Sequence, residues 1–134
     1  MKSHWLVHKG VEILYCDFTG FQKDIAGLRA EVEAADAEIL RKPKESVLAI
    51  ADLTGTVTST EVVDLFKNSA TATKDYIRKQ AVVGVTGIQK ILARAVAFFS
   101  GQSMHLFDDV EQAKEWLAGT SKNAGEEIRA NIRA

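Results

Sequence analysis

Residues 50–55 read IADLTG, and this stretch has two close counterparts, YCDFTG at residues 15–20 and GVTG at residues 84–87. In each case a short apolar run ends in threonine and glycine, and in two cases an aspartate stands two positions before the threonine. Apolar runs of this length are typical of strands buried on both faces, and Thr-Gly is typical of the turns that follow them. The repetition therefore predicts parallel strands that end at one edge of a sheet.

Helical periodicity separates these strands, with apolar residues three or four positions apart. The helical segments are residues 23–42, 62–77, 88–99 and 110–117. Residues 4–18 are typical of a β-hairpin that turns at Lys9-Gly10, and further strands are expected at residues 47–53, 81–85 and 104–107. The sequence therefore predicts an α/β fold with a mixed, mostly parallel sheet of about five strands and about four helices.

The chain has 134 residues, of which 46% are hydrophobic and 26% charged, and this composition is typical of one globular domain. We expect that domain to cover residues 1–119. Residues 120–134 have no strand pattern, but Ile128 and Ile132 lie four positions apart. A polar tail or a short helix is therefore expected there.

The charge and the single cysteine restrict the class of protein. A net charge of −1 provides no basic face for nucleic acid, so we expect no nucleic-acid partner. Cys16 lies in an apolar run and cannot form an internal disulfide, which favours a reducing compartment. No segment has the apolar length of a signal peptide or a membrane span. We expect a cytoplasmic protein without stable membrane insertion, and the edge strand of a small sheet makes a homodimer plausible.

The carboxyl ends of the parallel strands bring polar residues to one edge of the sheet, called the rim below. The residues expected there are Asp17, Thr19, Gly20, Asp52, Thr54, Gly55, Thr86 and Gly87. Ligands of open α/β sheets bind outside this edge, where helix N-termini present free N–H groups to anions. Lys90, in the first turn of a helix, is unfavourable against the helix dipole unless an anion lies nearby. These residues are therefore candidate contacts for a small ligand or a protein partner.

The same residues also have a structural interpretation as helix caps. A Ser, Thr or Asp before a helix, with Glu or Gln three positions later, provides hydrogen-bond partners for the first turn. The sequences that fit are Thr86 with Gln89, Thr58 with Glu61, and Asp108 with Glu111. In this interpretation each cap stabilises its helix by about 1 kcal/mol.

Asp17 and Asp52 could instead form a carboxylate pair for Mg²⁺ or for acid-base catalysis. No third acid or histidine at a recognisable spacing completes such a site, and an aspartate at a strand end commonly accepts hydrogen bonds from a turn. His4 and His8 lie on the same face of one strand and could bind a metal, but surface histidines are the more common case. We therefore expect no catalytic residue, no metal and no cofactor.

The remaining motifs favour a core rather than a nucleotide site. GVTGIQK, residues 84–90, lacks the spacing of a P-loop and the third glycine of a dinucleotide fingerprint. Large aromatic residues at helical or strand spacing usually fill the interior. Those expected mostly in the core, with part of the set lining an apolar pocket beneath the rim, are Trp5, Phe98, Phe99, Phe107 and Trp116.

The run VLAIADLTGTVTSTEVV, residues 47–63, resembles STAS domains, which have the fold of anti-sigma factor antagonists. The segments at residues 4–20, 81–101 and 104–117 are similar to a branch of small bacterial STAS-like proteins that is also likened to CRAL-TRIO lipid-transfer domains. The resemblance covers roughly residues 4–118 as a pattern of segments, without an invariant catalytic motif. It implies a STAS-like fold more strongly than any activity.

In antagonist STAS domains, a serine or threonine that opens the helix after such a strand is phosphorylated, and the phosphate disrupts binding to a kinase-like partner. The resemblance places this role at Thr58 and Ser59. The sequence departs from the family pattern because Ser59 is followed by Thr60 and Glu61 rather than by glycine. The glutamate repels an added phosphate, so a plain cap at Thr58 is the simpler interpretation.

Three hypotheses for the function follow. The leading one is a non-enzymatic binding or regulatory module of STAS-like type that contacts a protein or a small ligand at the rim. The second is a carrier of a small apolar or lipid-like ligand. The third is a metal-assisted enzyme that uses Asp17 and Asp52.

Overall fold

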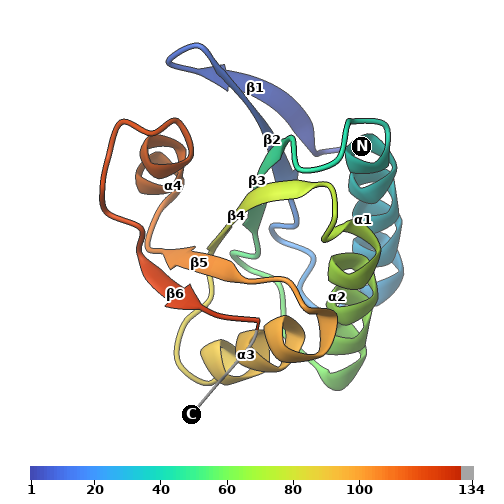
Figure 1. Cartoon of the computed structure of the whole chain (residues 1–134). Coiled ribbons are helices and arrows are strands. Elements are labelled where there is room, and N and C mark those ends of the chain that lie inside the picture. The colour runs from blue at the N-terminus through green and yellow to red at the C-terminus, as the bar shows by residue number, and fades with distance from the viewer. Residues whose placement is uncertain (131–134) are drawn as a thin grey trace.

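The fold of residues 1–130 is given by a computed structural model (Figure 1). The strands are β1 (His4–His8), β2 (Val11–Asp17), β3 (Val47–Asp52), β4 (Ile77–Val83), β5 (Met104–Phe107) and β6 (Glu126–Ile128). The helices are α1 (Ile25–Leu40), α2 (Thr60–Thr73), α3 (Ile88–Ser100) and α4 (Val110–Leu117). Within the described range, every helix is too short or too polar to cross a membrane.

All six strands form one sheet in the order β1-β2-β3-β4-β5-β6. The four central strands are parallel, and β1 and β6 add to the two edges in the antiparallel direction. The predicted α/β fold with a mixed, mostly parallel sheet and four helices is therefore confirmed, and so is the opening hairpin.

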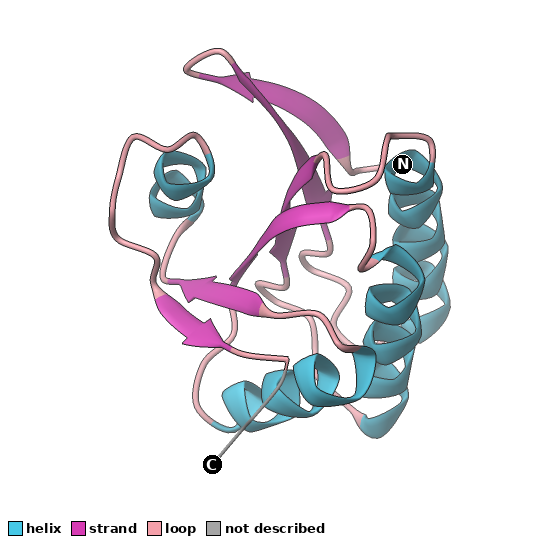
Figure 2. Ribbon diagram, viewed as in Figure 1, coloured by secondary structure: helices cyan, strands magenta, loops and turns pink. Residues whose placement is uncertain are grey.

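Helices cover both faces of the sheet (Figure 2). The apolar side chains of β3 alternate between the two sides: Val47 and Ala49 pack with α1 and α2, whereas Leu48 and Ile50 pack with α4. A third cluster joins α2 and α3 to β4, β5 and β6. Because β3 is buried on both sides, its sequence is a continuous apolar run rather than an alternating one.

The boundary between α2 and β4 differs from the prediction. Ile77 was expected to continue the helical stripe, but it begins β4 and is the register partner of Val47. The helix ends at Thr73, and a turn follows in which the Tyr76 N–H donates to the Thr73 carbonyl at 2.9 Å. Ile77 lies four positions after Thr73, so periodicity alone could not separate the last helical turn from the start of the strand.

The expected polar tail or short helix over residues 120–134 is a strand in part of its described range. Residues 126–128 form β6, in which Ile128 is buried opposite Met104 and the two glutamates are exposed. A strand of three residues is too short to show alternation in the sequence. The part of this expectation that rests on Ile132 lies outside the described residues.

Candidate ligand-binding site

At the rim, Asp17 of β2 and Asp52 of β3 are register partners on adjacent parallel strands. Asp17 Oδ1 accepts hydrogen bonds from the N–H and the hydroxyl of Thr19, at 3.1 and 2.6 Å. Asp52 Oδ1 accepts the same pair from Thr54, at 3.1 and 2.7 Å. The matched Asp-x-Thr sequences are therefore matched turns, in which a carboxylate satisfies a backbone N–H that the strand no longer pairs.

Backbone hydrogen bonds continue the parallel pairing beyond the strand ends. The Phe18 N–H donates to the Asp52 carbonyl at 3.0 Å, and the Gly20 N–H donates to the Thr54 carbonyl at 2.8 Å. Gly84, which follows β4, lies so close to this turn that a Cβ on it would stand 2.5 Å from the Thr54 nitrogen. The repeated glycines therefore let the three strand ends pack together.

Each of the two aspartates also has a second partner. Asp52 is only 6% exposed, and its Oδ2 accepts a hydrogen bond from the Tyr15 hydroxyl at 2.7 Å. Burial and this bond raise the pKa of Tyr15 above its usual range. Burial alone would raise the pKa of Asp17, but hydrogen bonds from Thr19 and the Lys2 ammonium 3.4 Å away outweigh it and lower that pKa. Both carboxylates therefore have structural partners at this edge.

No three histidine, cysteine or acidic side chains of residues 1–130 gather closely enough to hold a metal ion. His4 stacks on Tyr15 with 5.4 Å between ring centroids, whereas His8 Nε2 lies 3.1 Å from a carboxylate oxygen of Glu115 in α4. The two histidines that the sequence places on one strand face thus contact different partners.

The helix caps lie one residue away from their predicted positions. The N-cap of α2 is Ser59 rather than Thr58, and the Ser59 hydroxyl accepts a hydrogen bond from the Val62 N–H at 3.3 Å. The N-cap of α4 is likewise Asp109 rather than Asp108. In each case two adjacent residues can cap, and the extended backbone at the second selects it. Phosphorylation of Thr58 or Ser59 stays a prediction.

At α3 the predicted capping box is half formed. The N-cap is Gly87, which has no side chain to offer, and the Thr86 N–H donates to Oε1 of Gln89 at 3.2 Å. The other end of the Gln89 amide donates to the Thr58 hydroxyl at 3.1 Å and so joins the starts of α2 and α3. Lys90 Nζ lies 3.2 Å from a carboxylate oxygen of Glu126 in β6, so this lysine has an anionic partner within the protein and does not indicate a bound anion.

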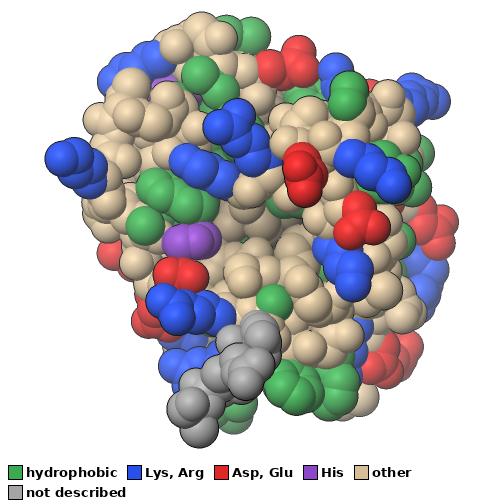
Figure 3. Space-filling view, viewed as in Figure 1, with side chains coloured by type: hydrophobic (Ala, Val, Ile, Leu, Met, Phe, Trp, Pro, Cys, Tyr) green, Lys and Arg blue, Asp and Glu red, His purple; other side chains and the backbone are tan. Residues whose placement is uncertain are grey.

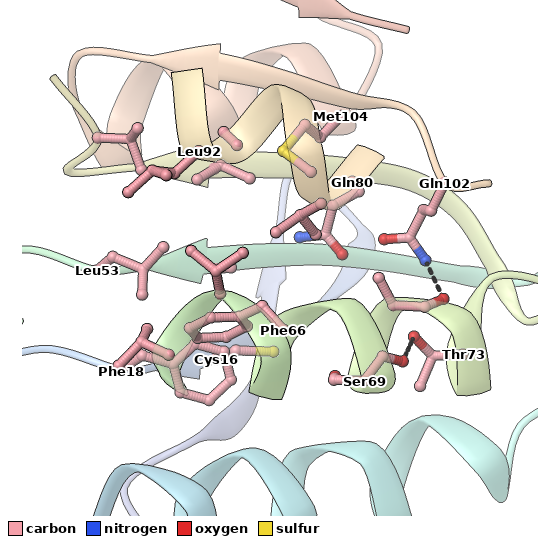
Figure 4. A pocket seen from close by; sticks show the side chains of 18 of the residues that line it. Cys16, Phe18, Leu53, Phe66, Ser69, Thr73, Gln80, Leu92, Gln102 and Met104 are labelled. Atoms are coloured by element: carbon pink, nitrogen blue, oxygen red, sulfur yellow. Dashed lines mark hydrogen bonds between the residues drawn. The ribbon is translucent and has the colours of Figure 1, made fainter. Parts of the chain in front are cut away.

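Beneath the rim, an apolar pocket of about 110 Å³ lies between α2, α3 and the sheet (Figure 4). Its side walls include Val62 and Phe66 of α2, Leu92 and Val96 of α3, Val82 of β4 and Met104 of β5. Leu53 and Val85, which follow β3 and β4, line the end near the rim. Of the predicted site residues, Thr58 lines the pocket, and the rim aspartates and threonines do not.

The opposite end of the pocket is polar. The side-chain amides of Gln80 and Gln102 point toward one another there (Figure 4). Their Nε2 groups donate to backbone carbonyls, at 2.9 Å to Ala81 and at 3.4 Å to Ala70. Their side-chain oxygens accept no hydrogen bond from residues 1–130. This end of the pocket therefore has acceptor capacity for a ligand group that donates a hydrogen bond.

Two titratable side chains line the pocket within the described residues, Cys16 and Asp36. Burial raises the pKa of the Cys16 thiol above its usual range. Asp36 of α1 accepts a hydrogen bond from the Ser69 hydroxyl at 2.7 Å, and burial raises its pKa to about 6 despite that bond. The Cys16 thiol in the lining is therefore uncharged, and the Asp36 carboxyl group is protonated more easily than an ordinary aspartate.

The expectation that Phe98 and Phe99 belong to the core is wrong, because both lie on the outer face of α3. Phe99 is 67% exposed, and the residues that α3 buries are Val96, Ala97 and Ser100. The exposed apolar residues of α3 are Ile88, Ile91, Phe98 and Phe99. Phe107 and Trp116 do lie in the core, as expected, and Trp5 packs partly buried against it. Helix α3 is thus apolar on both sides, so its sequence could not show which side faces inward.

Sequence reasoning did not identify three polar residues of the pocket, Asp36, Gln80 and Gln102, although two of them leave a trace in the sequence. Asp36 lies four positions after Val32 and so borders the apolar stripe of α1. Gln80 directly precedes the apolar run of β4. Gln102 lies in a loop between Gly101 and Ser103, where no periodicity marks it. A polar residue next to an apolar stripe can therefore indicate a pocket residue in the sequence. Gln102, in a loop, can be identified only once the fold is known.

Comparisons with protein-family models, with curated proteins and with solved structures found no match for this chain.

The two rim turns can be compared by mutation. We expect Asp52→Ala to lower the free energy of unfolding by about 2 to 3 kcal/mol, because Asp52 is buried and its loss leaves the Tyr15 hydroxyl and the Thr54 N–H without their acceptor. Asp17→Ala should cost only about 1 kcal/mol, since its side chain is more exposed. The measurement is urea denaturation at pH 7 for both variants.

The pH dependence of stability provides a second test of the role of Asp17. Because the folded state lowers the pKa of Asp17, its contribution is present above about pH 4 and is lost as the pH falls through the folded pKa. The difference between wild type and Asp17→Ala should therefore shrink on acidification. Equal costs for the two variants at pH 7, or a pH-independent Asp17 effect, would contradict this description of the turns.

Proposed function

We propose that the protein is a non-enzymatic binding module that holds a small, largely apolar ligand between α2, α3 and the sheet. The observation that carries the proposal is the lining of the pocket, which is apolar along its walls and polar at the end formed by Gln80 and Gln102. Concave sites with mostly apolar walls and a few placed polar groups are typical of ligand sites. The ligand therefore has an apolar body and one polar end.

The size of the pocket limits the ligand. A volume of about 110 Å³ is near that of apolar cavities that accept a benzene-sized molecule, at roughly 150 Å³. The pocket is open to solvent on one side, so its apolar walls contact water when it is empty. A ring or a short alkyl chain would remove these walls from water on binding, which is favourable.

The pocket chemistry favours binding over catalysis. The Cys16 thiol is buried and its raised pKa keeps it protonated, so it is a poor nucleophile. Asp36 bonds to Ser69 without a histidine that could complete an acid-base arrangement in the described part of the pocket. The metal-assisted use of Asp17 and Asp52 is the weaker alternative, because both carboxylates already have turn partners.

A STAS-like role in the cytoplasm agrees with this proposal. Thr58 lines the pocket, and Ser59 caps the helix that forms one wall. A phosphate on either residue would add charge at the start of α2, next to the rim end of the pocket. Ligand binding and phosphorylation would then act on the same element and could present it to a protein partner.

A second function, docking on an anionic membrane surface, is favoured by the outer face of α3. The face exposes Ile88, Ile91, Phe98 and Phe99 on the helix that forms a wall of the pocket. The charged residues of α3 are Lys90 and Arg94, without an acidic residue. An apolar face flanked by basic residues is typical of helices that lie in the interface of anionic bilayers. Such contact would let an apolar ligand enter without crossing water.

Filling the pocket tests the proposed function. Ala93 of α3 lines the pocket, whereas Ala95 of the same helix does not. We expect Ala93→Phe to reduce the affinity for 1-octanol at least about tenfold by occupying the cavity, with Ala95→Phe as the matched control. Isothermal titration calorimetry measures both. Unchanged octanol binding in folded Ala93→Phe, or no binding to the wild type across short-chain alcohols and benzene, would refute the proposal.

Removing the exposed rings tests the membrane contact. The double variant Phe98→Ser, Phe99→Ser should lose co-sedimentation with vesicles of phosphatidylcholine and phosphatidylglycerol, whereas Val7→Ser, which changes an exposed residue of β1, should keep it. Wild-type protein should bind vesicles of phosphatidylcholine alone more weakly. Equal vesicle binding by the double variant would contradict the proposal. A dimer in light scattering that this variant abolishes would assign the face to a second copy instead.

A further inference from the structure

A hollow of about 330 Å³ opens on the face of the molecule seen in Figure 3, where side chains of lysine and arginine lie above it and a histidine lies beside it. Its lining includes Lys74, Arg78, Lys79, His105 and Trp116. None of the described lining residues is an aspartate or a glutamate. The hollow is therefore a basic site of a size that suits the head group of a small ligand.

The hollow is a gap in the sheet. β4 begins at Ile77, but its pairing with β5 covers only residues 81–83, opposite residues 105–107. The preceding part of β4, residues 77–80, is bordered by the loop at residues 101–103 instead of by a strand. Because side chains of a strand point alternately to the two faces, Lys79 and Gln80 line this gap from opposite sides.

The three cations of the hollow have no acidic partner within 4 Å among residues 1–130. Lys79 Nζ lies 5.0 Å from the ring centroid of Trp116, which in turn stacks on His105 at 4.2 Å. Lys74 extends over Gly101, where a Cβ would stand 3.3 Å from Nζ. These contacts place the Lys74 and Lys79 charges at the hollow, which Arg78 also lines, and leave their donors available to an anion.

The hollow and the apolar pocket share two lining residues, Gln80 and Gln102. These are the glutamines whose amides form the polar end of the pocket (Figure 4). An apolar wall, a pair of amides and a group of cations thus follow one another across the gap in the sheet. This order matches a molecule with an apolar tail, a polar junction and an anionic head.

We propose that the ligand is an anionic amphiphile, with its short tail in the pocket, its junction between Gln80 and Gln102, and its carboxylate or phosphate head bound by Lys74, Arg78 and Lys79. This inference rests on the proposed function, since it uses the same pocket for the tail. It adds the class of head group and the site that binds it. The three cations would donate charge-assisted hydrogen bonds to an anionic head group. A neutral alcohol would accept weaker hydrogen bonds from the same donors.

Four probes with matched chemistry test the inference by calorimetry: octyl phosphate, octanoate, 1-octanol and inorganic phosphate. We expect both anionic amphiphiles to bind wild-type protein at least about tenfold more tightly than octanol, and this preference to weaken at high salt. Comparing the two amphiphiles identifies the preferred head. Inorganic phosphate should bind far more weakly than octyl phosphate, because it lacks the tail.

Charge removal locates the head. The variant Lys74→Gln, Arg78→Gln, Lys79→Gln should reduce the anionic preference to within about twofold while octanol binding persists. A control variant, Lys23→Gln, Arg29→Gln, Lys44→Gln, removes the same charges from exposed positions outside both cavities and should keep the preference. In Trp5→Phe protein, Trp116 is the remaining tryptophan, and its fluorescence should respond to octyl phosphate but not to octanol.

The other outcomes overturn the inference in distinguishable ways. Equal binding of octanol and the anionic amphiphiles would leave the pocket as proposed but exclude the head site. Inorganic phosphate that binds as tightly as octyl phosphate would make the hollow an anion site unconnected to the pocket. If no amphiphile binds, both this inference and the proposed function fail.

Discussion

The arrangement of the whole protein depends on the paired Asp-x-Thr turns that end β2 and β3. Asp17 and Asp52 stand in register, and each carboxylate holds the backbone and hydroxyl of the threonine that follows. These bonds satisfy backbone groups at the point where strand pairing stops, so the chain can leave the sheet without exposing buried polar atoms to an apolar interior. The Tyr15 hydroxyl donates to the second oxygen of Asp52, and the Lys2 ammonium lies 3.4 Å from Oδ1 of Asp17. The two aspartates, which first suggest a catalytic pair, thus determine where β2 and β3 end and the chain turns toward the next helix.

The pocket follows from that constraint. Because the turns after β3 and β4 end at the same rim, α2 and α3 begin side by side, and the Gln89 amide joins their first residues through Thr58. The two helices then pack on the same face of the sheet and leave an apolar cavity between them. At its far end, the loop before β5 diverges from β4, and Gln80 and Gln102 come to face each other. The same architecture therefore produces an apolar wall at one end and a polar, basic opening at the other.

Much of the fold could be predicted from the sequence, because strand, turn and helix each have a short-range pattern here. The IADLTG and YCDFTG repeats correctly indicate parallel strands that share an edge. The residues of the candidate site were harder to predict from the sequence. Phe98 and Phe99 have the spacing of core residues but point outward, since α3 is apolar on both sides and only packing selects one. Gln102 joins Gln80 through a gap in the sheet, a relation between residues distant in sequence that no local periodicity encodes. Caps differ by one residue because neighbouring hydroxyl or acidic side chains compete for the same role.

The central claim is that the cavity between α2 and α3 binds an apolar group, and the two methionines of the chain allow a direct test. Met104 lines the cavity, whereas Met1 lies exposed at the N-terminus. Protein labelled with ¹³C at the methionine methyl groups should therefore give two resolved signals in a heteronuclear NMR spectrum. On titration with 1-octanol, we expect the Met104 signal to move in a saturable manner and the Met1 signal to stay in place. A Met104 signal that does not move, or one that moves only in parallel with Met1 without saturation, would contradict the account.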